Sequence, residues 1–515
     1  RPSAGYHINY DDETYREYVT QYSNRRNMVY VGANDGMLHA FNGGMLDPAS
    51  VSYADGDHHP LGAEMWAYVP FNLLPHLRWL ASPNYPHVYY MDGPVRSYDV
   101  NIFPNDPTHP GGWGTIIVAG MRFGGGDYSL DHDNDSDTPN ITTRSAYVIL
   151  DVTDPEQPPT LIAEITDEDL GFTSVVPALV KNRRAGAGGD FSSPADNDWY
   201  LVFGSGPGGN NASERRQALE SAVSTKPARV YVFDLGSKTL TDTVLPEPSS
   251  FVGGMASGDW NNDYVDDAVY FGLVSGSPLS PSGKLVRGEI RSFSGSGFTA
   301  SYNDLYSQRN LAFSAVPRTY ADGNDFWIYA GTGRFYSGED NLSTQPQYYF
   351  GIKEPKDGST LSDVNLVDVT EVVVFEDERV KEEGHTQVTL SANGISDNTI
   401  NRFPDVRRFV RNHGDGWMFG FRDLYLPHGD QNTYQGIRNF TEASLAGDIL
   451  VRTAYDASMD SCRAEGVGLL YTPYFDAGVP APFIAVYDEE YPRLPAEGED
   501  DIDMARRVVT GHTLT

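Results

Sequence analysis

The chain has 515 residues, with 37 Lys and Arg against 71 Asp and Glu, which gives a formal net charge of −34. This excess of negative charge argues against nucleic-acid binding, because a polyanion is bound through Lys and Arg. The sequence has no apolar run of 18 or more residues, so no membrane span is expected, and the single cysteine, Cys462, excludes an internal disulfide.

Composition indicates the fold class. The chain contains 52 Gly and 33 Pro, while 39% of its residues are hydrophobic and 12% are aromatic. This apolar fraction is sufficient for a folded core and too high for a disordered acidic chain. Turn-forming residues at this density favour many short strands. We therefore predict an all-β protein.

One pattern recurs along the chain: a β-branched and aromatic run, a Gly-rich turn, and a second run that ends at Asp, Asn or Gly. It occupies 28–44, 115–120 with 145–155, 198–209 with 228–237, 266–276 with 287–297, 326–336 with 347–355, 416–421, and 447–456 with 466–478. A single hairpin cannot bury its own faces, whereas hairpins stacked around an axis bury one another. The sequence therefore predicts a modified β-propeller of about seven blades with long loop insertions.

The pattern divides the chain into three parts. Residues 1–27 are an N-terminal lead-in segment, 28–480 the propeller, and 481–515 an acidic C-terminal tail or capping segment. One insertion, 210–223, is predicted to be helical because it combines good helix formers with an Asn and Ser start. The chain opens at Arg1 without a methionine, which is typical of a processed product or a fragment.

The loop GDWNNDYVDDAVYFG (258–272) is a candidate metal site. Asp259, Asn261, Asp263 and Asp267 stand at loop positions 1, 3, 5 and 9, and Val265 at position 7 can offer its backbone carbonyl. Ca²⁺ takes about 6–8 oxygen ligands in a flexible cage, so alternating hard oxygen donors along a tight turn suit it. The spacing predicts a calcium site.

The loop departs from an EF-hand, because Tyr264 stands where Gly is usual, Tyr270 stands where a bidentate Glu is usual, and a strand follows. We interpret it as a strand-flanked calcium loop, with an acidic hairpin turn that binds no ion as the alternative. The alternating aspartates from Asp131 to Asp137 are a candidate for a second ion, although solvent alone would also relieve their repulsion.

The segment GSGPGG (204–209) raises a different possibility. Gly204, Gly206 and Gly209 satisfy G-x-G-x-x-G between a strand and a predicted helix, and Asp234 ends the next strand, as in a dinucleotide-binding fold. This alternative remains open at the sequence level, although a lone fingerprint in a chain of hairpins is a weak signal.

Seven segments stand out in series: VYVGANDGMLHAFN (29–42), EMWAYVPFNLLPHL (64–77), HVYYMDGPVRSYDV (87–100), YVILDVTDP (147–155), DLGFTSVVPALV (169–180), DWYLVFGSG (198–206) and AGTGRFYSGED (330–340). In this order they resemble the C-terminal β-propeller of the PilY/PilC family of type IV pilus proteins. The resemblance implies a modified seven-bladed propeller on an extracellular protein at the pilus tip or the outer-membrane surface. It also implies support of pilus assembly, opposition to retraction and a contribution to surface attachment.

The resemblance implies a ligand set and partners as well. A family loop of the form D-x-[DN]-x-[DN]-x-x-x-D binds Ca²⁺ and controls whether pili stay extended, and it falls on Asp259, Asn261, Asp263 and Asp267, with Val265 as carbonyl donor. The implied partners are minor pilins or the pilus tip complex and a host or abiotic surface. No catalytic residues are predicted, since the chain has no G-x-S-x-G, no H-E-x-x-H and no Cys/His cluster.

Two other functions stay open. A quinoprotein-type propeller oxidoreductase would hold a quinone between a tryptophan and a metal; the candidates are Trp66, Trp113, Trp199, Trp260 and Trp327, each of which is also a natural blade-packing residue. A glycan-binding surface protein, with exposed tyrosines as the contact surface, is the other alternative.

Overall fold

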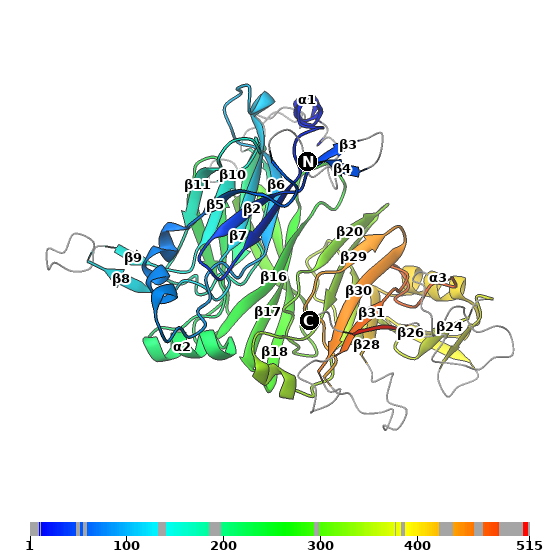
Figure 1. The fold of residues 1–515 in the computed structure, drawn as a ribbon. Coiled ribbons are helices and arrows are strands. Elements are labelled where there is room, and N and C mark those ends of the chain that lie inside the picture. The colour runs from blue at the N-terminus through cyan, green and yellow to red at the C-terminus, as the bar shows by residue number, and fades with distance from the viewer. Residues whose placement is uncertain are drawn as a thin grey trace.

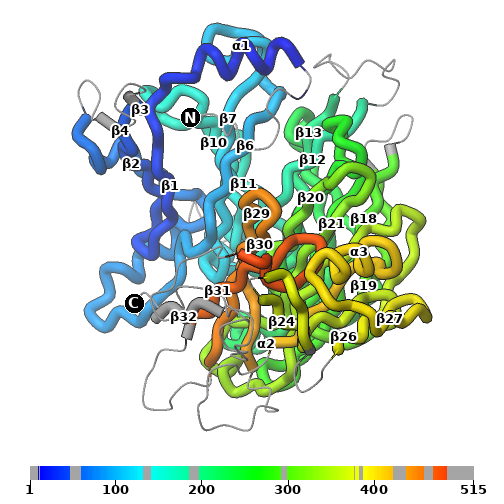
Figure 2. Tube along the Cα trace, turned by 90° about the vertical axis from the view of Figure 1, so that its right-hand side faces the viewer, coloured from blue at the N-terminus to red at the C-terminus, as the bar shows by residue number. Residues whose placement is uncertain are grey.

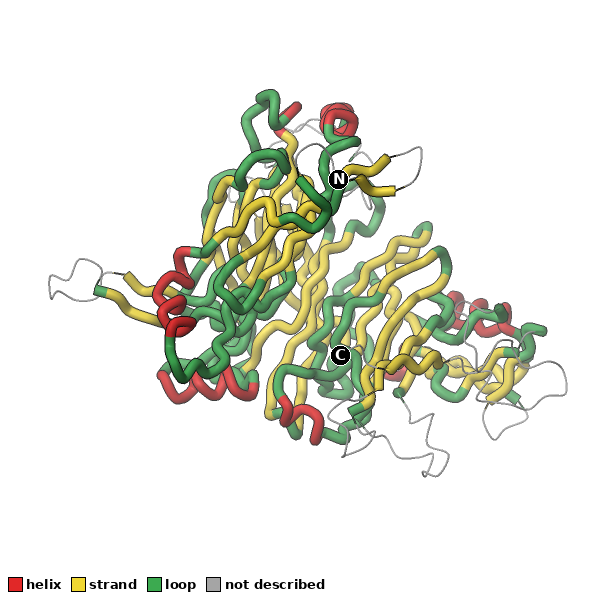
Figure 3. Tube along the Cα trace, in the orientation of Figure 1, coloured by secondary structure: helices red, strands yellow, loops and turns green. Residues whose placement is uncertain are grey.

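The computed structural model describes residues 10, 12–47, 52–54, 59–131, 141–184, 197–292, 298–375, 377–382, 387–421, 436–457, 467–483 and 508–512. Strands dominate this part of the chain, and the helices are few and short (Figure 3). The all-β prediction is therefore confirmed. None of the described helices is both long and apolar enough to cross a membrane.

Six sheets of three or more strands follow one another within the described ranges. The first sheet holds β1 (Met28–Gly32), β2 (Leu38–Asn42) and β5 (Glu64–Tyr68). The second sheet holds β6 (Val95–Asn101), β7 (Trp113–Gly120), β10 (Tyr147–Asp151) and β11 (Thr160–Ile165). The third sheet holds β12 (Ala178–Arg183), β13 (Asn197–Gly204), β14 (Arg229–Asp234) and β15 (Leu240–Val244). The fourth sheet holds β16 (Ser250–Gly258), β17 (Ala268–Ser277), β18 (Ser280–Ser292) and β19 (Phe298–Tyr306). The fifth sheet holds β20 (Arg318–Asp322), β21 (Asp325–Gly331), β22 (Tyr348–Lys353), β28 (Gly416–Gly420) and β23 (Val367–Asp368). The sixth sheet holds β29 (Ser444–Ala446), β30 (Ile449–Asp456), β31 (Val467–Tyr471) and β32 (Val508–His512). Paired neighbours are antiparallel except β23 with β28, so each sheet is essentially a meander.

Smaller elements decorate these sheets. The two-stranded hairpins are β3 (Met45–Asp47) with β4 (Ser52–Ala54), β8 (Tyr128–Leu130) with β9 (Ile141–Thr143), β24 (Val372–Val374) with β25 (Val380–Glu382), and β26 (Val388–Ala392) with β27 (Ile395–Ile400). The helices are α1 (Glu13–Gln21), α2 (Ala212–Ser221), α3 (Phe403–His413) and the 3-10 helices η1 (Phe71–Ala81), η2 (Pro110–Gly112), η4 (Gly338–Leu342) and η5 (Asp363–Asn365). The helix predicted over 210–223 is α2, which begins where the Asn211 side chain accepts a hydrogen bond from the Glu214 amide.

The sheets are arranged around a common axis. In Figure 2 the chain runs from blue β1 and β2 on one side, through β6 and β12, to green β20 and β21 on the other side, and orange β29 and β30 lie between them. The first strands of successive sheets contact one another, β1 with β6, β12 with β16, and β16 with β20. Glu442, just before β29, pairs with both Arg96 of β6 and Arg318 of β20, so the last sheet also reaches the axis.

The number of blades stays a prediction. Six sheets lie within the described ranges, against the seven or so expected from the repeats. The division into three parts also stays a prediction, and contacts join these parts at their ends. Residues 508–512, from the expected tail, form β32 and pair with β31 in the sixth sheet. In the expected lead-in, α1 places the Tyr15 hydroxyl 2.9 Å from Asp99 Oδ2 of β6.

The glycines at the end of β13 and just after it are required by close packing between sheets. A Cβ on Gly206 would lie 1.8 Å from the carbonyl oxygen of Phe172, which follows the second sheet. A Cβ on Gly204 would lie 2.1 Å from the Val252 Cβ on β16 of the fourth sheet. Moreover, β13 pairs with β14 in antiparallel register, whereas a dinucleotide-binding unit needs parallel strands joined by the helix. The nucleotide-binding alternative for GSGPGG is therefore wrong.

Candidate metal centre

The predicted metal ligands lie in the turn that joins β16 to β17 in the fourth sheet. Gly258 pairs with Ala268 across the two strands, and the Asp267 amide donates to the Gly258 carbonyl oxygen at 2.9 Å. The ladder ends at this pair, and the residues between them form a closed loop. Because the strands on both sides are largely buried, they fix the position of both ends of the loop.

Asp259 organises the first half of the loop. Its Oδ1 accepts hydrogen bonds from the amides of Asn261 and Asp263, both at 3.2 Å, and its Oδ2 accepts from the Tyr264 amide at 2.7 Å. The Asn261 Oδ1 accepts from the Asp263 amide at 3.0 Å. In turn, the Asp263 Oδ1 accepts from the Val265 amide at 2.9 Å. The backbone thus closes around the Asp259 carboxylate, while Asn261 and Asp263 each bond to an amide two residues further on.

The winding places two residues in the left-handed region, Asn262 with φ 57° and Tyr264 with φ 67°. This conformation is common for Asn and rare for an aromatic residue, where it costs about 1–2 kcal/mol. Tyr264 occupies the position where an EF-hand has Gly, and the backbone there is left-handed despite its side chain. The hydrogen bond from its amide to Asp259 helps to hold it in place.

The loop carries more negative charge than its own hydrogen bonds compensate. Burial raises the pKa of Asp267 to about 6 against the lowering effect of a hydrogen bond from the Trp260 amide, and the charges of Asp259 and Asp263 add to the rise. Burial also raises the pKa of Asp259, and the charge of Asp263 contributes. The three carboxylates are therefore close enough to repel one another, and a cation among them would relieve that repulsion.

A neighbouring carboxylate and a lysine, which the spacing did not identify, join the loop to the third sheet. The Lys181 amide on β12 donates to Asp266 Oδ2 at 2.8 Å, and the Asp266 amide donates to the Lys181 carbonyl at 3.0 Å. Burial raises the pKa of Asp266 to about 7. Burial lowers the pKa of Lys181, while the charges of Asp12, Asp266, Asp263 and Asp259 oppose that change. The Lys181 ammonium group therefore already interacts electrostatically with the carboxylates of the loop.

A chain of hydrogen bonds joins the loop to the fifth sheet. Trp260 donates from Nε1 to the Tyr270 hydroxyl at 2.6 Å, and this hydroxyl donates to Glu354 Oε2 at 2.9 Å. Glu354, just after β22, forms an ion pair at 2.5 Å with Arg287 of β18, and both side chains are fully buried. The Lys356 ammonium donates to the Trp260 carbonyl at 3.2 Å. The loop of the fourth sheet is thus connected by hydrogen bonds to the third and fifth sheets. The spacing of residues in the sequence did not predict these connections.

The donor set fits a hard cation by its chemistry. It offers carboxylate and amide oxygens from one short turn, which are ligands typical of Ca²⁺. Within the described ranges, however, no three His, Cys, Asp or Glu side chains are grouped so that they could hold a metal ion. The acidic oxygens bond to loop amides instead. The second acidic candidate, Asp131–Asp137, falls from residue 132 onward outside the described residues, so it stays a prediction.

The tryptophans considered for a quinone site all have packing roles. Trp113 and Trp199 meet edge to face, with 5.5 Å between ring centroids. Trp327 is fully buried in the core around the fifth sheet. Trp66 packs against the core of the first two sheets, and Trp260 is engaged in the hydrogen bond described above. The indole N–H groups of Trp199 and Trp327 are buried without a hydrogen-bond partner, and nothing in these contacts favours a quinone.

In sequence, the chain is similar to curated type IV pilus proteins. A Xylella fastidiosa protein described as a type IV pilus biogenesis factor PilY1 homolog is 24% identical over 469 residues, which cover 88% of this chain and 30% of that protein. The type IV pilus biogenesis factor PilY1 of Pseudomonas aeruginosa strain UCBPP-PA14 is 24% identical over 344 residues, which cover 63% of this chain and 25% of that protein. The chain therefore spans less than a third of the length of these relatives. No protein-family model matches it.

In structure, the chain is similar to the crystal structure of the Pseudomonas aeruginosa PilY1 C-terminal domain. The TM-score is 0.53 at 19% sequence identity, and the match covers 93% of this chain and 84% of that one. That domain is a β-propeller, so the predicted propeller fold is confirmed. The resemblance to the PilY/PilC family, which rested on seven short segments, is confirmed by the sequence similarity to the curated PilY1 proteins.

Proposed function

Since the chain is a relative of the PilY1 proteins and shares the β-propeller fold of their C-terminal domain, we propose that it is the propeller of a type IV pilus biogenesis factor, with a binding rather than a catalytic role. The sequence match over 88% of the chain supports this proposal. The propeller would act outside the cell, at the pilus tip or the outer-membrane surface. Its partners there would be minor pilins or the pilus tip complex, and a host or abiotic surface.

We propose further that the loop between β16 and β17 binds Ca²⁺. The ligands would be the side-chain oxygens of Asp259, Asn261, Asp263 and Asp267 and the carbonyl oxygen of Val265. The observations that support this assignment are the closure of the loop around the Asp259 carboxylate and the mutual repulsion of Asp259, Asp263 and Asp267. Without a bidentate Glu the site would be a modest one, with a Kd of roughly 10⁻⁶ to 10⁻⁴ M.

The position of the loop suggests how an ion would regulate the protein. Asp266 bonds to Lys181 of the third sheet, and Trp260 reaches Glu354 of the fifth sheet through Tyr270. A bound ion would hold the loop in one conformation and thereby fix the junction of three blades. Calcium occupancy would then stabilise the propeller surface that a pilus partner contacts, and so bias pili toward extension over retraction and toward surface attachment.

Thermal unfolding of the purified chain tests the calcium site. Saturating ligand adds RT ln(1 + [L]/Kd) to the folded state, about 2.7 kcal/mol at one hundred times Kd, so 1 mM Ca²⁺ should raise the Tm by about 2–3 °C if the Kd is about 10⁻⁵ M. Asp267→Ala should abolish this rise. The control Asn262→Gly should retain it, because Asn262 is exposed, is not a predicted ligand and has a φ of 57° that Gly tolerates. An unchanged rise in Asp267→Ala would remove the assignment.

A cell assay tests the proposed role in the pilus. The full-length protein that contains this chain would be replaced in its own host by the Asp267→Ala and Asn262→Gly variants, and surface pili would be counted by electron microscopy. We expect few extended pili in the first variant and normal numbers in the second. Deletion of the whole protein with no effect on piliation or surface attachment would contradict the pilus role, whatever the outcome at the loop.

A further inference from the structure

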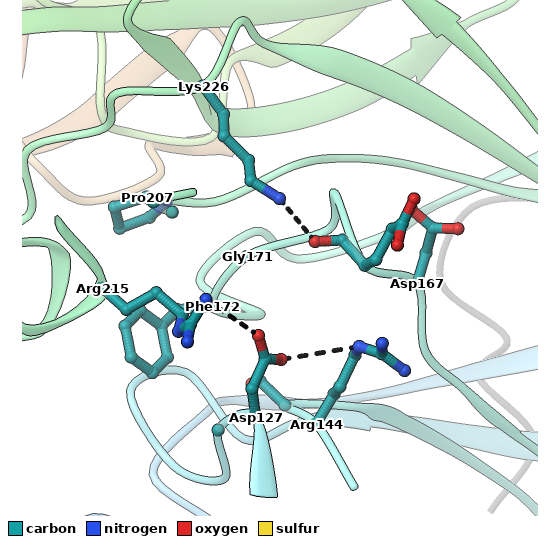
Figure 4. A pocket seen from close by; sticks show the side chains of 13 residues that line it. Asp127, Arg144, Asp167, Gly171, Phe172, Pro207, Arg215 and Lys226 are labelled. Carbon is teal, nitrogen blue, oxygen red and sulfur yellow. Dashed lines mark hydrogen bonds and ion pairs between the residues drawn. The ribbon is translucent and has the colours of Figure 1, made fainter. Parts of the chain in front are cut away.

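A polar pocket opens beside the second and third sheets, near α2. It lies between the base of the β8–β9 hairpin, the loop after β11 and the Gly-rich turn after β13, and it is partly open to solvent (Figure 4). Its lining includes three cations, three carboxylates, one aromatic ring and several glycines. The charged lining residues are Arg144, Arg215, Lys226, Asp127, Asp167 and Glu168. In Figure 1, α2 lies at the opposite end of the molecule from α1. The pocket is therefore distinct from the loop discussed above, which adjoins the α1 end through Lys181 and Tyr10.

Two guanidinium groups in this pocket share one carboxylate. Arg144 Nε lies 3.5 Å from Asp127 Oδ1, and Arg215 Nη1 lies 3.4 Å from Asp127 Oδ2 (Figure 4). These separations are long for charge-assisted hydrogen bonds, which are about 2.7–2.9 Å. The Arg144 Nε is shielded from solvent and makes no hydrogen bond. The pair thus retains about one unit of positive charge and unused donors.

The third cation is already satisfied, which separates it from the arginine pair. Lys226 Nζ lies 2.7 Å from Asp169 Oδ1 and donates to the Glu168 carbonyl at 2.6 Å. Asp169 also pairs with Arg229 at 2.7 Å. Ordinary ion-pair distances are therefore reached within the same region, and the long contacts of Asp127 mark a site whose coordination is incomplete.

The other wall of the pocket offers acceptors and an apolar face. Asp167 accepts the Tyr231 hydroxyl at 2.9 Å and the Asp169 amide at 2.9 Å, and these bonds fix its carboxylate in place. Glu168 is exposed beside it. Phe172 packs edge to face on Phe123 with 5.7 Å between ring centroids, which holds its ring at the pocket wall. Both carboxylates can accept hydrogen bonds from hydroxyl groups, and their negative charge disfavours a second anionic group at this wall.

We propose that the pocket binds an acidic sugar residue of the uronic acid type. Its single carboxylate would take the free donors of Arg144 and Arg215, its hydroxyls would donate to Asp167 and Glu168, and an apolar ring face would lie against Phe172. The charge left over by the arginine pair matches a monoanion, whereas a phosphate dianion would carry one more negative charge than the pair offers and would lie near Asp167 and Glu168. The pocket thus adds a ligand site to the proposed pilus role and does not depend on calcium.

Binding of monosaccharides to the purified chain tests this site. Isothermal titration calorimetry with D-glucuronate and D-galacturonate would be compared with D-glucose, D-galactose, acetate and N-acetylglutamate amide. We expect at least one uronate to bind at least tenfold more tightly than its neutral sugar and than acetate. Arg144→Met and Arg215→Met, which lie on different elements, should each reduce this preference tenfold or more. Circular dichroism and the Tm would confirm that both variants fold.

The matched control is Arg216→Met, the next residue on α2, whose side chain is 77% exposed and pairs with Glu220 at 2.7 Å. This variant should bind the uronate as the unchanged protein does. The inference is overturned if neutral sugars bind as tightly as uronates, or if N-acetylglutamate amide binds as tightly as the uronate. It is also overturned if Arg216→Met weakens uronate binding as much as Arg144→Met does. Uronate binding should persist in EDTA and in Asp267→Ala, so failure of the calcium site and failure of this site are separable.

Discussion

The buried ion pair between Arg287 and Glu354 allows a quantitative test of how the loop is anchored. Both side chains are fully buried, and the hydrogen-bond chain from Trp260 ends on Glu354. Glu354→Gln keeps the size of the side chain and an acceptor oxygen for the Tyr270 hydroxyl, but it removes the negative charge. The Arg287 guanidinium would then remain buried, with a 3.5 Å contact to the Ser359 carbonyl and an Nε that makes no hydrogen bond.

Removing one partner of a buried ion pair costs about 3–5 kcal/mol, because the other charge stays buried without compensation. The few remaining contacts of Arg287 place the expected loss in the upper part of that range. A matched control lies on the same strand. Glu289 pairs with Arg291 at 3.9 Å, and their side chains are 33% and 53% exposed, so Glu289→Gln should cost less than about 1 kcal/mol.

Urea unfolding followed by intrinsic fluorescence gives the difference in free energy of unfolding for each variant. Arg287→Met combined with Glu354→Gln should recover most of the loss, because it removes the uncompensated buried charge while Gln keeps an acceptor oxygen for the Tyr270 hydroxyl. The reasoning is refuted if Glu354→Gln is no more destabilising than Glu289→Gln. It is also refuted if the double variant is less stable than Glu354→Gln alone.

Three other predictions concern the loop, the first sheet and the blade contacts. Lys181→Met should increase calcium affinity roughly threefold to tenfold, since it removes a cation from the field of the loop; unchanged affinity in a calorimetric titration would contradict this. For His39, burial alone would lower the pKa, but hydrogen bonds to Glu64 at 2.8 Å and Asp35 at 3.0 Å raise it. Its contribution to stability should therefore be full below about pH 6.5 and be lost as the pH rises through the higher folded pKa. The Tm of His39→Gln should accordingly be lower than that of the unchanged protein at pH 5.5 and equal to it at pH 8.5. A difference in Tm that does not depend on pH would disprove the assignment. Gly206→Ala should lower the Tm measurably, because its Cβ would meet the carbonyl oxygen of the adjacent loop at 1.8 Å; an unchanged Tm would show that the contact yields.

The hairpins and one helix could be predicted from the sequence because their signals are local. Alternating apolar residues and Gly-rich turns predicted pairs such as β1 with β2, and an Asn start predicted α2. The spacing of Asp259 to Asp267 likewise identified a turn between paired strands. Residue spacing also suggested a nucleotide-binding loop at GSGPGG, which was wrong, because the same glycines are needed where sheets meet closely.

Contacts between distant segments could not be predicted. Lys181 and Glu354 are separated from the loop by many residues and reach it only because successive sheets pack around an axis. In the same way, Asp127 and Arg215 come from different elements, and neither stands in a recognisable motif. The apolar pattern of residues 508–512 is too short to distinguish a strand from a frayed helix. These residues form a strand because they pair with β31.

Calorimetric titration of Ca²⁺ into the EDTA-treated chain tests the central claim most directly, with Mg²⁺ as the competing ion. We predict one saturable site per chain with a Kd between roughly 10⁻⁶ and 10⁻⁴ M, lost in Asp267→Ala and retained in Asn262→Gly. The absence of any saturable heat from Ca²⁺, or equal heats in Asp267→Ala and the unchanged protein, would contradict the assignment of the loop between β16 and β17.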